Sequence, residues 1–322
     1  MQMPDNLAVL LSFFTKTIET TETLTKKGRP YVYPSLNLLY FFIVMQLKGI
    51  HHFKTMSKYI AIHHLRFGLA KAPSRKTLRR RFLEMPGFVR WLLPCIAREL
   101  SQMDQRYRLR VGFVDKSVFA AFGGIWHKKH MQQGVVPHKS IDTDASWAKS
   151  AYHGWRFGYG LHIVVNAMRM PLQAVVTTAQ SKDTLQVYSL LNGLRELHII
   201  VADAGYRSIR FLVRIWKQLS VFVLTNKPFE TVSKAKKWYN RLWQKDYRGK
   251  LYKKRKPSVE PAFSLIKNLF KLEGKNKLPY KGLPKVSAYL MVCVAAIQFL
   301  IVFNFIFNHK PREFRHFLAL TI

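Results

Sequence analysis

The ten residues His198-Ile-Ile-Val-Ala-Asp-Ala-Gly-Tyr-Arg207 indicate the fold class. Four apolar residues, Ile199 to Ala202, run without alternation into Asp203, and Gly205 follows. A short apolar run that ends near a glycine is typical of a strand buried on both faces of a sheet. Asp203 would then lie at the carboxyl end of this strand, where open α/β sheets build their sites. An acid that only caps the following helix is the alternative.

Further strands and helices are predicted around this strand. Period-two alternation from Arg110 to Phe119 places Val111, Phe113 and Asp115 on one face of a first strand. The other predicted elements are strands at 157–168, 172–179 and 221–224 and helices at 183–194, 208–218 and 258–272. A stripe of Leu185, Tyr188, Leu191 and Leu194 is expected to be the buried side of the helix at 183–194. This order predicts a mixed α/β sheet flanked by helices.

The chain outside the sheet divides by composition. Residues 1–105 are expected to be helical, with helices at 36–47, 56–69 and 75–82, and Ser74 is a natural N-cap for the last of these. Residues 126–153 are predicted to be a loop rich in His and Lys. We therefore predict a helical DNA-binding domain at 1–105, a catalytic domain at 106–308 with a basic insertion at 226–256, and a tail at 309–322.

The charge of the chain indicates its partner. The 322 residues are 48% hydrophobic, enough for a sizeable core, and they include 53 Lys and Arg against 17 Asp and Glu. The formal net charge of +36 predicts a polyanionic partner, with nucleic acid the default. The two cysteines lie in apolar surroundings and suggest a reducing compartment, with neither a disulfide framework nor a zinc site. Residues 1–15 do not resemble a secretory signal.

Residues 286–307 form an uncharged stretch that is long enough to span a bilayer. The alternative is a helix buried in a large core. Gln298 and Asn304 within the stretch, and the amount of basic sequence ahead of it, favour the core helix. No membrane association is therefore expected.

Basic residues gather in three segments that could contact DNA phosphates. The helix at 75–82 supplies the first group and the loop at 126–153 the second. The insertion at 226–256 supplies the third, with 12 basic and 2 acidic residues and with Trp238, Tyr239, Trp243 and Tyr247 interleaved. The residues predicted to bind DNA are Arg75, Arg79, Arg80, Arg81, Lys128, Lys129, Lys234, Lys236 and Lys237. A solvated basic surface is the alternative for each segment, and the aromatic side chains could either stack a base or pack the insertion.

Three acids lie where they could meet. Asp115 is near the end of the first strand, Asp203 ends a later one, and Glu260 lies in the first turn of the last α/β helix, with Lys267 two turns beyond. Oxygen ligands that converge from different elements suit Mg²⁺ or Mn²⁺. Two such ions can activate a water or a 3′ hydroxyl at a phosphodiester. A cap or an ion pair is the alternative for each acid alone.

Other acids are weaker candidates for a metal site. Asp183 begins a helix, where a plain N-terminal acid is the favoured interpretation. Asp142 and Asp144 lie in the loop at 126–153 and are not assigned to metal.

Four stretches carry a resemblance to a known family. They are Val114-Asp-Lys-Ser-Val118, Tyr152-His-Gly-Trp-Arg-Phe-Gly-Tyr-Gly-Leu-His162, Val201-Ala-Asp-Ala-Gly-Tyr206 and Arg255-Lys-Pro-Ser-Val-Glu-Pro-Ala-Phe-Ser-Leu-Ile-Lys267. Over about residues 110 to 305 the chain resembles the DDE transposases of bacterial insertion sequences, whose catalytic domain is ribonuclease-H-like. The resemblance implies that Asp115, Asp203 and Glu260 are the metal-binding catalytic triad, with Mg²⁺ or Mn²⁺ as two ions.

The last stretch departs from the family's pattern in one respect. The family signature has Tyr, two residues, Arg, three residues, Glu, six residues and Lys. Here Tyr252, Arg255 and Glu260 have one extra residue between Arg and Glu, while Glu260 and Lys267 keep the spacing. By the resemblance, Tyr252, Arg255 and Lys267 contact phosphates of DNA.

The resemblance also implies an activity. The protein would cleave DNA at the terminal repeats of its mobile element and join the 3′ ends to target DNA. It would act as a homodimer on DNA, in the bacterial cytoplasm and associated with the nucleoid. The alternative is a catalytically silent DNA-binding protein derived from a transposase.

Overall fold

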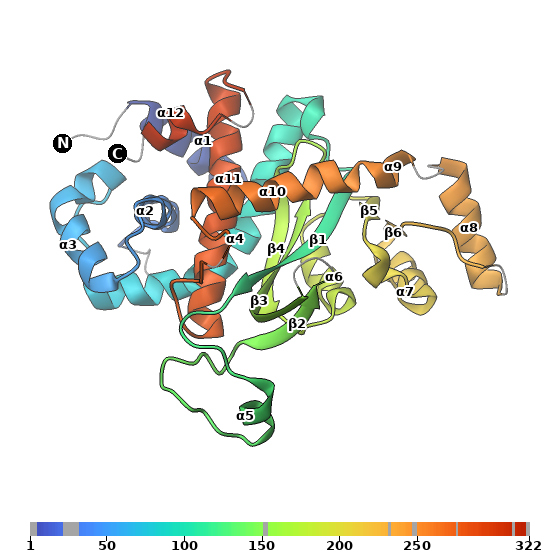
Figure 1. The fold of residues 1–322 in the computed structure, drawn as a ribbon. Coiled ribbons are helices and arrows are strands. Elements are labelled where there is room, and N and C mark those ends of the chain that lie inside the picture. Colours follow the sequence, from blue (N-terminus) through green and yellow to red (C-terminus); the bar gives the residue numbers. More distant parts are fainter. Residues whose placement is uncertain are drawn as a thin grey trace.

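A six-stranded mixed sheet is the centre of the computed structural model, which describes residues 5–21, 32–150, 154–230, 233–246, 250–274, 276–310 and 313–319 (Figure 1). The strands are β1 (Val111–Ala120), β2 (Ser146–Ser150), β3 (Gly154–Val165), β4 (Pro171–Thr178), β5 (Ile199–Val201) and β6 (Phe222–Leu224). All five predicted strands are present, and β2 is an addition. The sequence of β2, Ser-Trp-Ala-Lys-Ser, has no apolar run, so the segment was expected to be loop.

The order of the strands confirms the predicted fold class. β3 is antiparallel to β1 and β4, and β2 pairs with the first part of β3. β5 is parallel to β1, and β6 is parallel to β5. Three antiparallel strands followed by two parallel ones give the ribonuclease-H-like arrangement. Helices flank this sheet, and the N-terminal part of the chain is helical.

The helices are α1 (Asp5–Thr21), α2 (Ser35–Leu47), α3 (Phe53–His63), α4 (Arg75–Met103), α5 (Lys128–Gln132), α6 (Asp183–Leu191), α7 (Ile209–Leu219), α8 (Lys234–Asp246), α9 (Lys250–Lys253), α10 (Arg255–Leu269), α11 (Leu283–Ile306) and α12 (Arg315–Ala319). Helices extend from the sheet on both sides in Figure 1, with α2 and α3 at the left and α7 and α8 at the right. Short 3-10 turns lie at His64–Phe67, Gln105–Tyr107 and Ala204–Tyr206.

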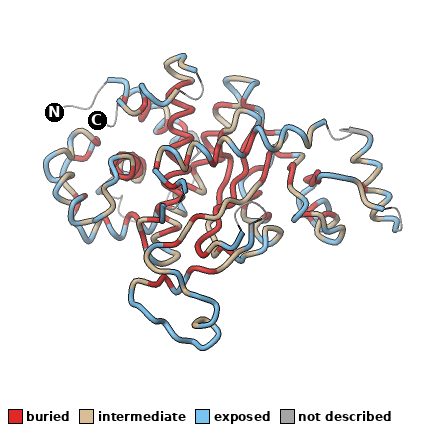
Figure 2. Tube along the Cα trace, in the orientation of Figure 1, coloured by how far each residue is buried: buried red, intermediate tan, exposed pale blue. Residues whose placement is uncertain are grey.

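Helix α11 is the central helix of the core. By length and composition it is the one helix in the described ranges that could cross a membrane, yet 94% of its most apolar window is buried inside the protein. It packs against α4, β4 and α2. Gln298 within it donates hydrogen bonds to the carbonyl oxygens of Leu93 (2.8 Å) and Pro171 (3.1 Å), which satisfies a polar amide in an apolar environment. Figure 2 shows α11 and the strands as the most buried parts of the chain, with the segment around α5 at the surface.

Asp142 and Asp144 have a structural role at the start of α11. Asp142 is buried and accepts hydrogen bonds from the hydroxyl of Tyr159 (2.8 Å) and the backbone amide of Gly282 (3.0 Å). Asp144 accepts one from the amide of Leu283 (2.9 Å). The two carboxylates therefore satisfy N-terminal amides of α11 and complement its dipole.

Two predictions about helices were correct only in part. The helix expected at 75–82 is α4, which continues through Pro86 and Pro94 to Met103, because its apolar face is buried along its whole length. Ser74 caps it as predicted, accepting a hydrogen bond from the amide of Thr77 (3.2 Å). Of the stripe predicted for the helix at 183–194, Leu191 and Leu194 are buried as expected, whereas Leu185 (67%) and Tyr188 (37%) are exposed and Val187 and Leu190 are buried in their place.

The apolar core is continuous from the N-terminal helices to the sheet. Buried residues of α2, α4, α11 and the strands belong to one cluster, and α4 packs against both α11 and β4. The boundary near residue 105 thus marks a change from helices to sheet within one core. The division into domains by function stays a prediction.

Candidate active site

The register of two parallel strands brings Asp115 and Asp203 to the same level of the sheet. Phe113 of β1 pairs with Val201 of β5, and each acid follows two residues later. Asp203 lies just beyond the carboxyl end of β5, and Asp115 lies in the middle of β1, just beyond the part of β1 that pairs with β5. The backbone amide of Lys116 donates to Oδ1 of Asp115 (2.9 Å).

Asp183 joins these two acids from the first turn of α6. A side chain added at Gly205 would place its Cβ 3.1 Å from Oδ1 of Asp203 and 3.7 Å from Oδ2 of Asp183. The two carboxylates therefore face the same glycine, which leaves room for their close approach. The amide of Gly205 also donates to Oδ1 of Asp203 (2.9 Å).

Tyr206 is close enough to the three acids to feel the charge of each. Its ring is fully buried, and its hydroxyl has no hydrogen-bond partner among the described residues. Burial raises the pKa of Tyr206, and the negative charges of Asp183, Asp203 and Asp115 raise it further. Because one phenol feels all three carboxylates, the acids form one cluster.

Burial and mutual repulsion raise the pKa of two carboxyl groups in the cluster. The side chains of Asp115 and Asp183 are 24% and 25% exposed. Burial raises the pKa of each, and the charge of Asp203 adds to the rise in both. Arg255 opposes the rise at Asp115, and Lys116 opposes it at Asp183. Each half-buried carboxylate thus has one basic partner, and Asp203 repels both.

Nδ1 of His162 and Oδ1 of Asp183 lie 3.7 Å apart. His162 is buried, and burial followed by the charge of Lys116 lowers its pKa to about 3, so its ring is neutral at physiological pH. The hydroxyl of Thr177 donates to the carbonyl of Thr178 (2.9 Å), so Nε2 of His162, 3.0 Å away, donates to that hydroxyl. This tautomer leaves a lone pair on Nδ1, which lies 3.7 Å from Oδ1 of Asp183.

Neither of these two atoms has a hydrogen-bond partner among the described residues, although Nζ of Lys116 is 3.2 Å from Oδ1 of Asp183. The Lys116 ammonium is the partner of Asp183, so Nδ1 of His162 is the acceptor left over, and the three neighbouring carboxylates offer the oxygen ligands that a divalent cation prefers. Asp115, Asp183 and Asp203 are therefore the residues that could hold it.

Glu260 stands apart from this cluster in the structure, and its assignment as the third acid stays a prediction. Its side chain is 56% exposed and pairs with Lys256 (3.8 Å) on the same helix. It also lines a cavity of about 460 Å³ with residues of α10 and α11 and of the turn between β3 and β4. The extra residue after Arg255 explains this position. Five residues turn a helix by about 500°, which leaves Glu260 about 140° away from Arg255, whereas four would leave about 40°.

Arg255 itself reaches the cluster. Its Nη1 donates to Oδ2 of Asp115 (2.5 Å), and its guanidinium lies 5.9 Å from the ring of Tyr252. Lys267 is half-buried, with Nζ 5.8 Å from the ring of Phe119, and burial lowers its pKa. The Tyr, Arg and Lys of the signature thus lie along α9 and α10, with Arg255 in contact with the acids.

A basic and aromatic cleft adjoins Asp183. It has a volume of about 450 Å³, and its walls include Lys116, Lys149, Lys182, Trp147 and Trp155. Trp155 is 54% exposed, and Nζ of Lys128 lies 3.2 Å from the centre of its ring. Sequence reasoning did not find this cleft, because its residues come from separate strands and loops. The signal available was the run Gln180-Ser-Lys-Asp183, which follows directly on β4.

Three of the four predicted arginines of α4 are exposed, and one is not. Arg75, Arg79 and Arg80 reach solvent. Arg81 is 3% exposed and donates to Glu84 (2.8 Å), to the hydroxyl of Ser35 (2.7 Å) and to the carbonyl of Tyr33. Its prediction as a DNA-binding residue is wrong, because its guanidinium ties α4 to the start of α2. Lys128 and Lys129 are exposed on α5.

The basic insertion forms α8 and α9, and its aromatic residues pack inward. The hydroxyl of Tyr239 accepts from the amide of Thr225 (3.0 Å), and the indole of Trp243 donates to the carbonyl of Thr225 (3.0 Å). Trp238 contacts the ring of Trp216. These three residues therefore pack the insertion against β6 and α7, and Tyr247 lies outside the described residues. Lys234 and Lys237 are exposed, and Lys236 is half-buried.

Comparison with known families identifies the class. Residues 107–299, more than half of the chain, match the family described as "Transposase DDE domain". This protein belongs to that family of transposases. The matched range contains β1 to β6, Asp115, Asp183, Asp203 and Glu260. Its origin in a bacterial insertion sequence stays a prediction.

Comparisons with individual proteins add little. No curated protein matches the chain. Among solved structures, the chain is similar to the Mos1 transposase paired-end complex with left transposon end, at 11% identity and a TM-score of 0.22, covering 85% of this chain and 90% of that one. It is also similar to the pre-cleavage Mos1 transpososome, at 10% identity and a TM-score of 0.21, covering 87% and 84%. At such low TM-scores neither similarity bears on the function or the site.

Proposed function

We propose that this protein is an active, metal-dependent transposase that cleaves DNA at the ends of its mobile element and joins the 3′ ends to target DNA. Membership of the transposase family supports the class of reaction. The observation that carries the proposal is the proximity of Asp115 in β1, Asp203 after β5 and Asp183 at the start of α6, whose charges all act on Tyr206.

The three carboxylates would hold Mg²⁺ or Mn²⁺, as two ions. When bound, such ions stabilise charge on the phosphodiester and help to generate the attacking oxygen nucleophile. The relief of repulsion among the three acids favours this occupancy. Lys116 keeps Asp183 in place through their ion pair (3.2 Å) while its Nζ donates to the carbonyl of Ser181 (2.8 Å).

The adjoining cleft would receive the DNA strand. Lys149 and Lys182 are exposed at its mouth and can bind phosphates, while Trp155 presents a ring on which a base can stack. Arg255 lies between the acids and α9, so it can move from Asp115 to a phosphate near the scissile bond. The exposed arginines of α4 and the lysines of α8 would bind flanking duplex DNA. We further propose terminal repeats and target DNA as partners, a homodimer on DNA, and a nucleoid-associated location in the bacterial cytoplasm.

A second candidate is a catalytically silent DNA-binding protein derived from a transposase. The observation that favours it is the position of Glu260, the acid that the family signature assigns to the site, outside the carboxylate cluster.

One experiment separates the two candidates. The DNA that flanks the coding region would be used as a linear duplex substrate, with cleavage measured in Mg²⁺ and in Mn²⁺ at saturating protein. The proposal expects strand cleavage at the repeat ends that Asp203→Asn abolishes while DNA affinity is retained. Binding without cleavage in either metal would support the silent protein, and full activity of Asp203→Asn would overturn the assignment of the site.

A further inference from the structure

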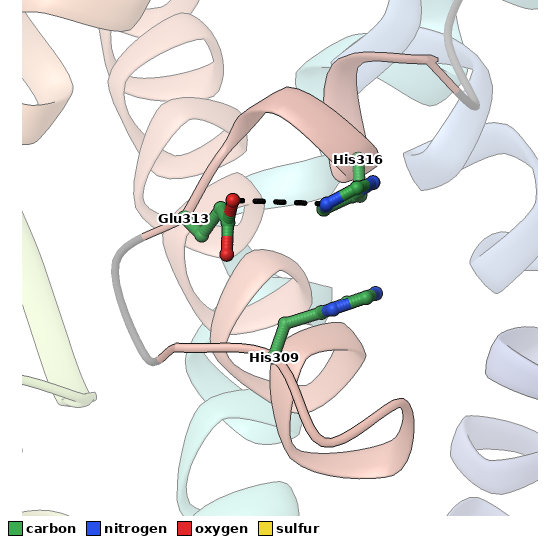
Figure 3. A group of neighbouring side chains, drawn as sticks. All are labelled: His309, Glu313 and His316. Atoms are coloured by element: carbon green, nitrogen blue, oxygen red, sulfur yellow. Dashed lines mark ion pairs between the residues drawn. The ribbon is translucent and has the colours of Figure 1, made fainter.

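A group of two histidines and one glutamate lies at the end of the chain, away from the carboxylate cluster. His309 follows α11, Glu313 precedes α12, and His316 lies on α12 (Figure 3). The nitrogen or oxygen atoms that these side chains offer all lie within 4.8 Å of one another. Nε2 of His316 is 3.7 Å from Oε1 of Glu313, and the rings of His309 and His316 stack at 4.4 Å.

The backbone around this group is fixed by contacts that do not involve the three side chains. The amide of His309 donates to the carbonyl of Asn304 (2.8 Å), and the side chain of Asn304 donates to the carbonyl of Glu313 (3.0 Å). Phe317 is fully buried and contacts the ring of Phe303. The chain therefore folds back on the end of α11, and this fold brings the three side chains together.

The three donor groups indicate which class of metal ion would bind. Two imidazoles and one carboxylate suit a borderline divalent cation such as Zn²⁺, whereas Mg²⁺ prefers an octahedron of oxygen atoms. In a tetrahedral zinc site neighbouring ligand atoms are about 3.3 Å apart. His316 is exposed, and His309 and Glu313 are only half-buried, so small side-chain rotations can close the remaining distance.

The three side chains do not satisfy one another. At 3.7 Å the contact between Glu313 and His316 is too long for a hydrogen bond, so it is at most a solvated ion pair. A shared cation would use all three groups at once. It would also join residues on both sides of the turn between α11 and α12, and binding to the folded chain would stabilise that turn.

We propose that His309, Glu313 and His316 bind one Zn²⁺-class cation, with a fourth position open to water, and that this site clips α12 to the end of α11. Phe314, between two of the ligands, lines the cavity that also contains Glu260. The clip therefore fixes a segment that borders α10. Its role is structural and independent of the catalytic chemistry proposed above.

The test measures Zn²⁺ binding by the full-length protein without DNA, by calorimetry and by competition with a chromophoric chelator. The protein would carry Asp115→Asn and Asp203→Asn to remove most binding at the carboxylate cluster. We expect one Zn²⁺ per chain, with the affinity lowered about tenfold or more by each of His309→Gln, Glu313→Gln and His316→Gln. Replacement by Co²⁺ should give the visible absorption of a four-coordinate site with nitrogen and oxygen ligands.

The matched control is His198→Gln, an exposed histidine outside the C-terminal segment, which should leave the affinity unchanged. Circular dichroism in the absence of metal would show whether the variants fold. Unchanged Zn²⁺ affinity in folded His309→Gln and His316→Gln would overturn the proposal, and so would equal losses in the control. If the two histidine variants fail to fold, Glu313→Gln decides, because this substitution keeps the size of the side chain, and unchanged Zn²⁺ affinity in Glu313→Gln would then overturn the proposal.

Discussion

The identity of the third acid can be tested by the effect of metal on thermal stability. The structure places Asp183 with Asp115 and Asp203 and leaves Glu260 outside. Asp183→Asn and Glu260→Gln each remove one negative charge without changing size. The two substitutions should therefore differ in metal binding and in little else.

The repulsion between Asp183 and Asp203 can be calculated from the distance between their carboxylates. Both carboxylates lie within 4 Å of the Cβ position of Gly205, which places their nearest oxygen atoms no more than about 7 Å apart. At an effective dielectric constant of about 20, two unit charges at 7 Å repel by about 2 kcal/mol. A divalent cation between them replaces this repulsion by attraction, so the folded state should gain stability when metal is added.

The expected effect of metal binding can be expressed as an increase in Tm. At a metal concentration about 100 times the dissociation constant, ligand binding stabilises the folded protein by about 2.7 kcal/mol. For a chain of this size that corresponds to an increase in Tm of about 5 °C. If the loss of one ligand weakens binding about tenfold, the stabilisation falls to about 1.4 kcal/mol and the shift is roughly halved.

The assay is calorimetric or fluorescence-monitored melting of the DNA-free protein, with and without Mn²⁺. We expect the Mn²⁺-induced shift to be halved or lost in Asp115→Asn, Asp183→Asn and Asp203→Asn and to be retained in Glu260→Gln. A shift that survives Asp183→Asn but disappears in Glu260→Gln would refute the reasoning. It would mean that α10 carries Glu260 into the site when metal binds.

Three further predictions concern charge, the first at the same acids and the other two elsewhere in the protein. Burial raises the folded-state pKa of Asp115 and Asp183 above the ordinary carboxyl value. The metal-free protein should therefore bind extra protons and become more stable as the pH falls through those raised values, and melting against pH should show a smaller gain in Asp115→Asn/Asp183→Asn. Arg81→Ala should lower the free energy of unfolding by about 1–3 kcal/mol in denaturant titrations because it leaves buried groups unpaired, whereas Arg79→Ala should weaken DNA binding with little effect on stability. Changing Lys234 and Lys237 to Ala should reduce the salt dependence of DNA affinity by about two counterion contacts, whereas an unchanged slope would show that α8 is only a solvated surface.

The sequence predicted Asp115 and Asp203 as acids of neighbouring strands, but it did not predict that Asp183 lies near Asp203. An unbroken apolar run followed by an acid locates Asp203, and period-two alternation locates Asp115. Asp183 starts a helix, where the helix dipole is enough to explain an acid. Only the pairing of β3 with β4 and the following turn place it against Gly205. Such contacts depend on the register between distant strands, which local patterns do not encode.

The aromatic residues of the insertion show the same limit. Trp and Tyr residues interleaved with lysines can either stack on bases of DNA or pack inside the insertion. The sequence pattern at 226–256 is compatible with both. The structure favours packing for Tyr239 and Trp243, because both form hydrogen bonds with Thr225 next to β6. A buried hydroxyl or indole needs a polar partner, and the partner is identified only once the strand is in place.

The position of Glu260 follows from the apolar side of its own helix. Val259, Phe263 and Ile266 are buried and face the sheet, and they fix the rotation of α10 about its axis. Turning the helix by about 140° to bring Glu260 to the side of Arg255 would expose these side chains, each worth about 1.5–3 kcal/mol when buried. Three such losses amount to several kcal/mol, more than the roughly 2.7 kcal/mol that metal binding at 100 times its dissociation constant provides. By this comparison metal binding alone does not rotate α10, so we expect Asp183, which already lies near Asp203, to complete the site at the least cost in free energy.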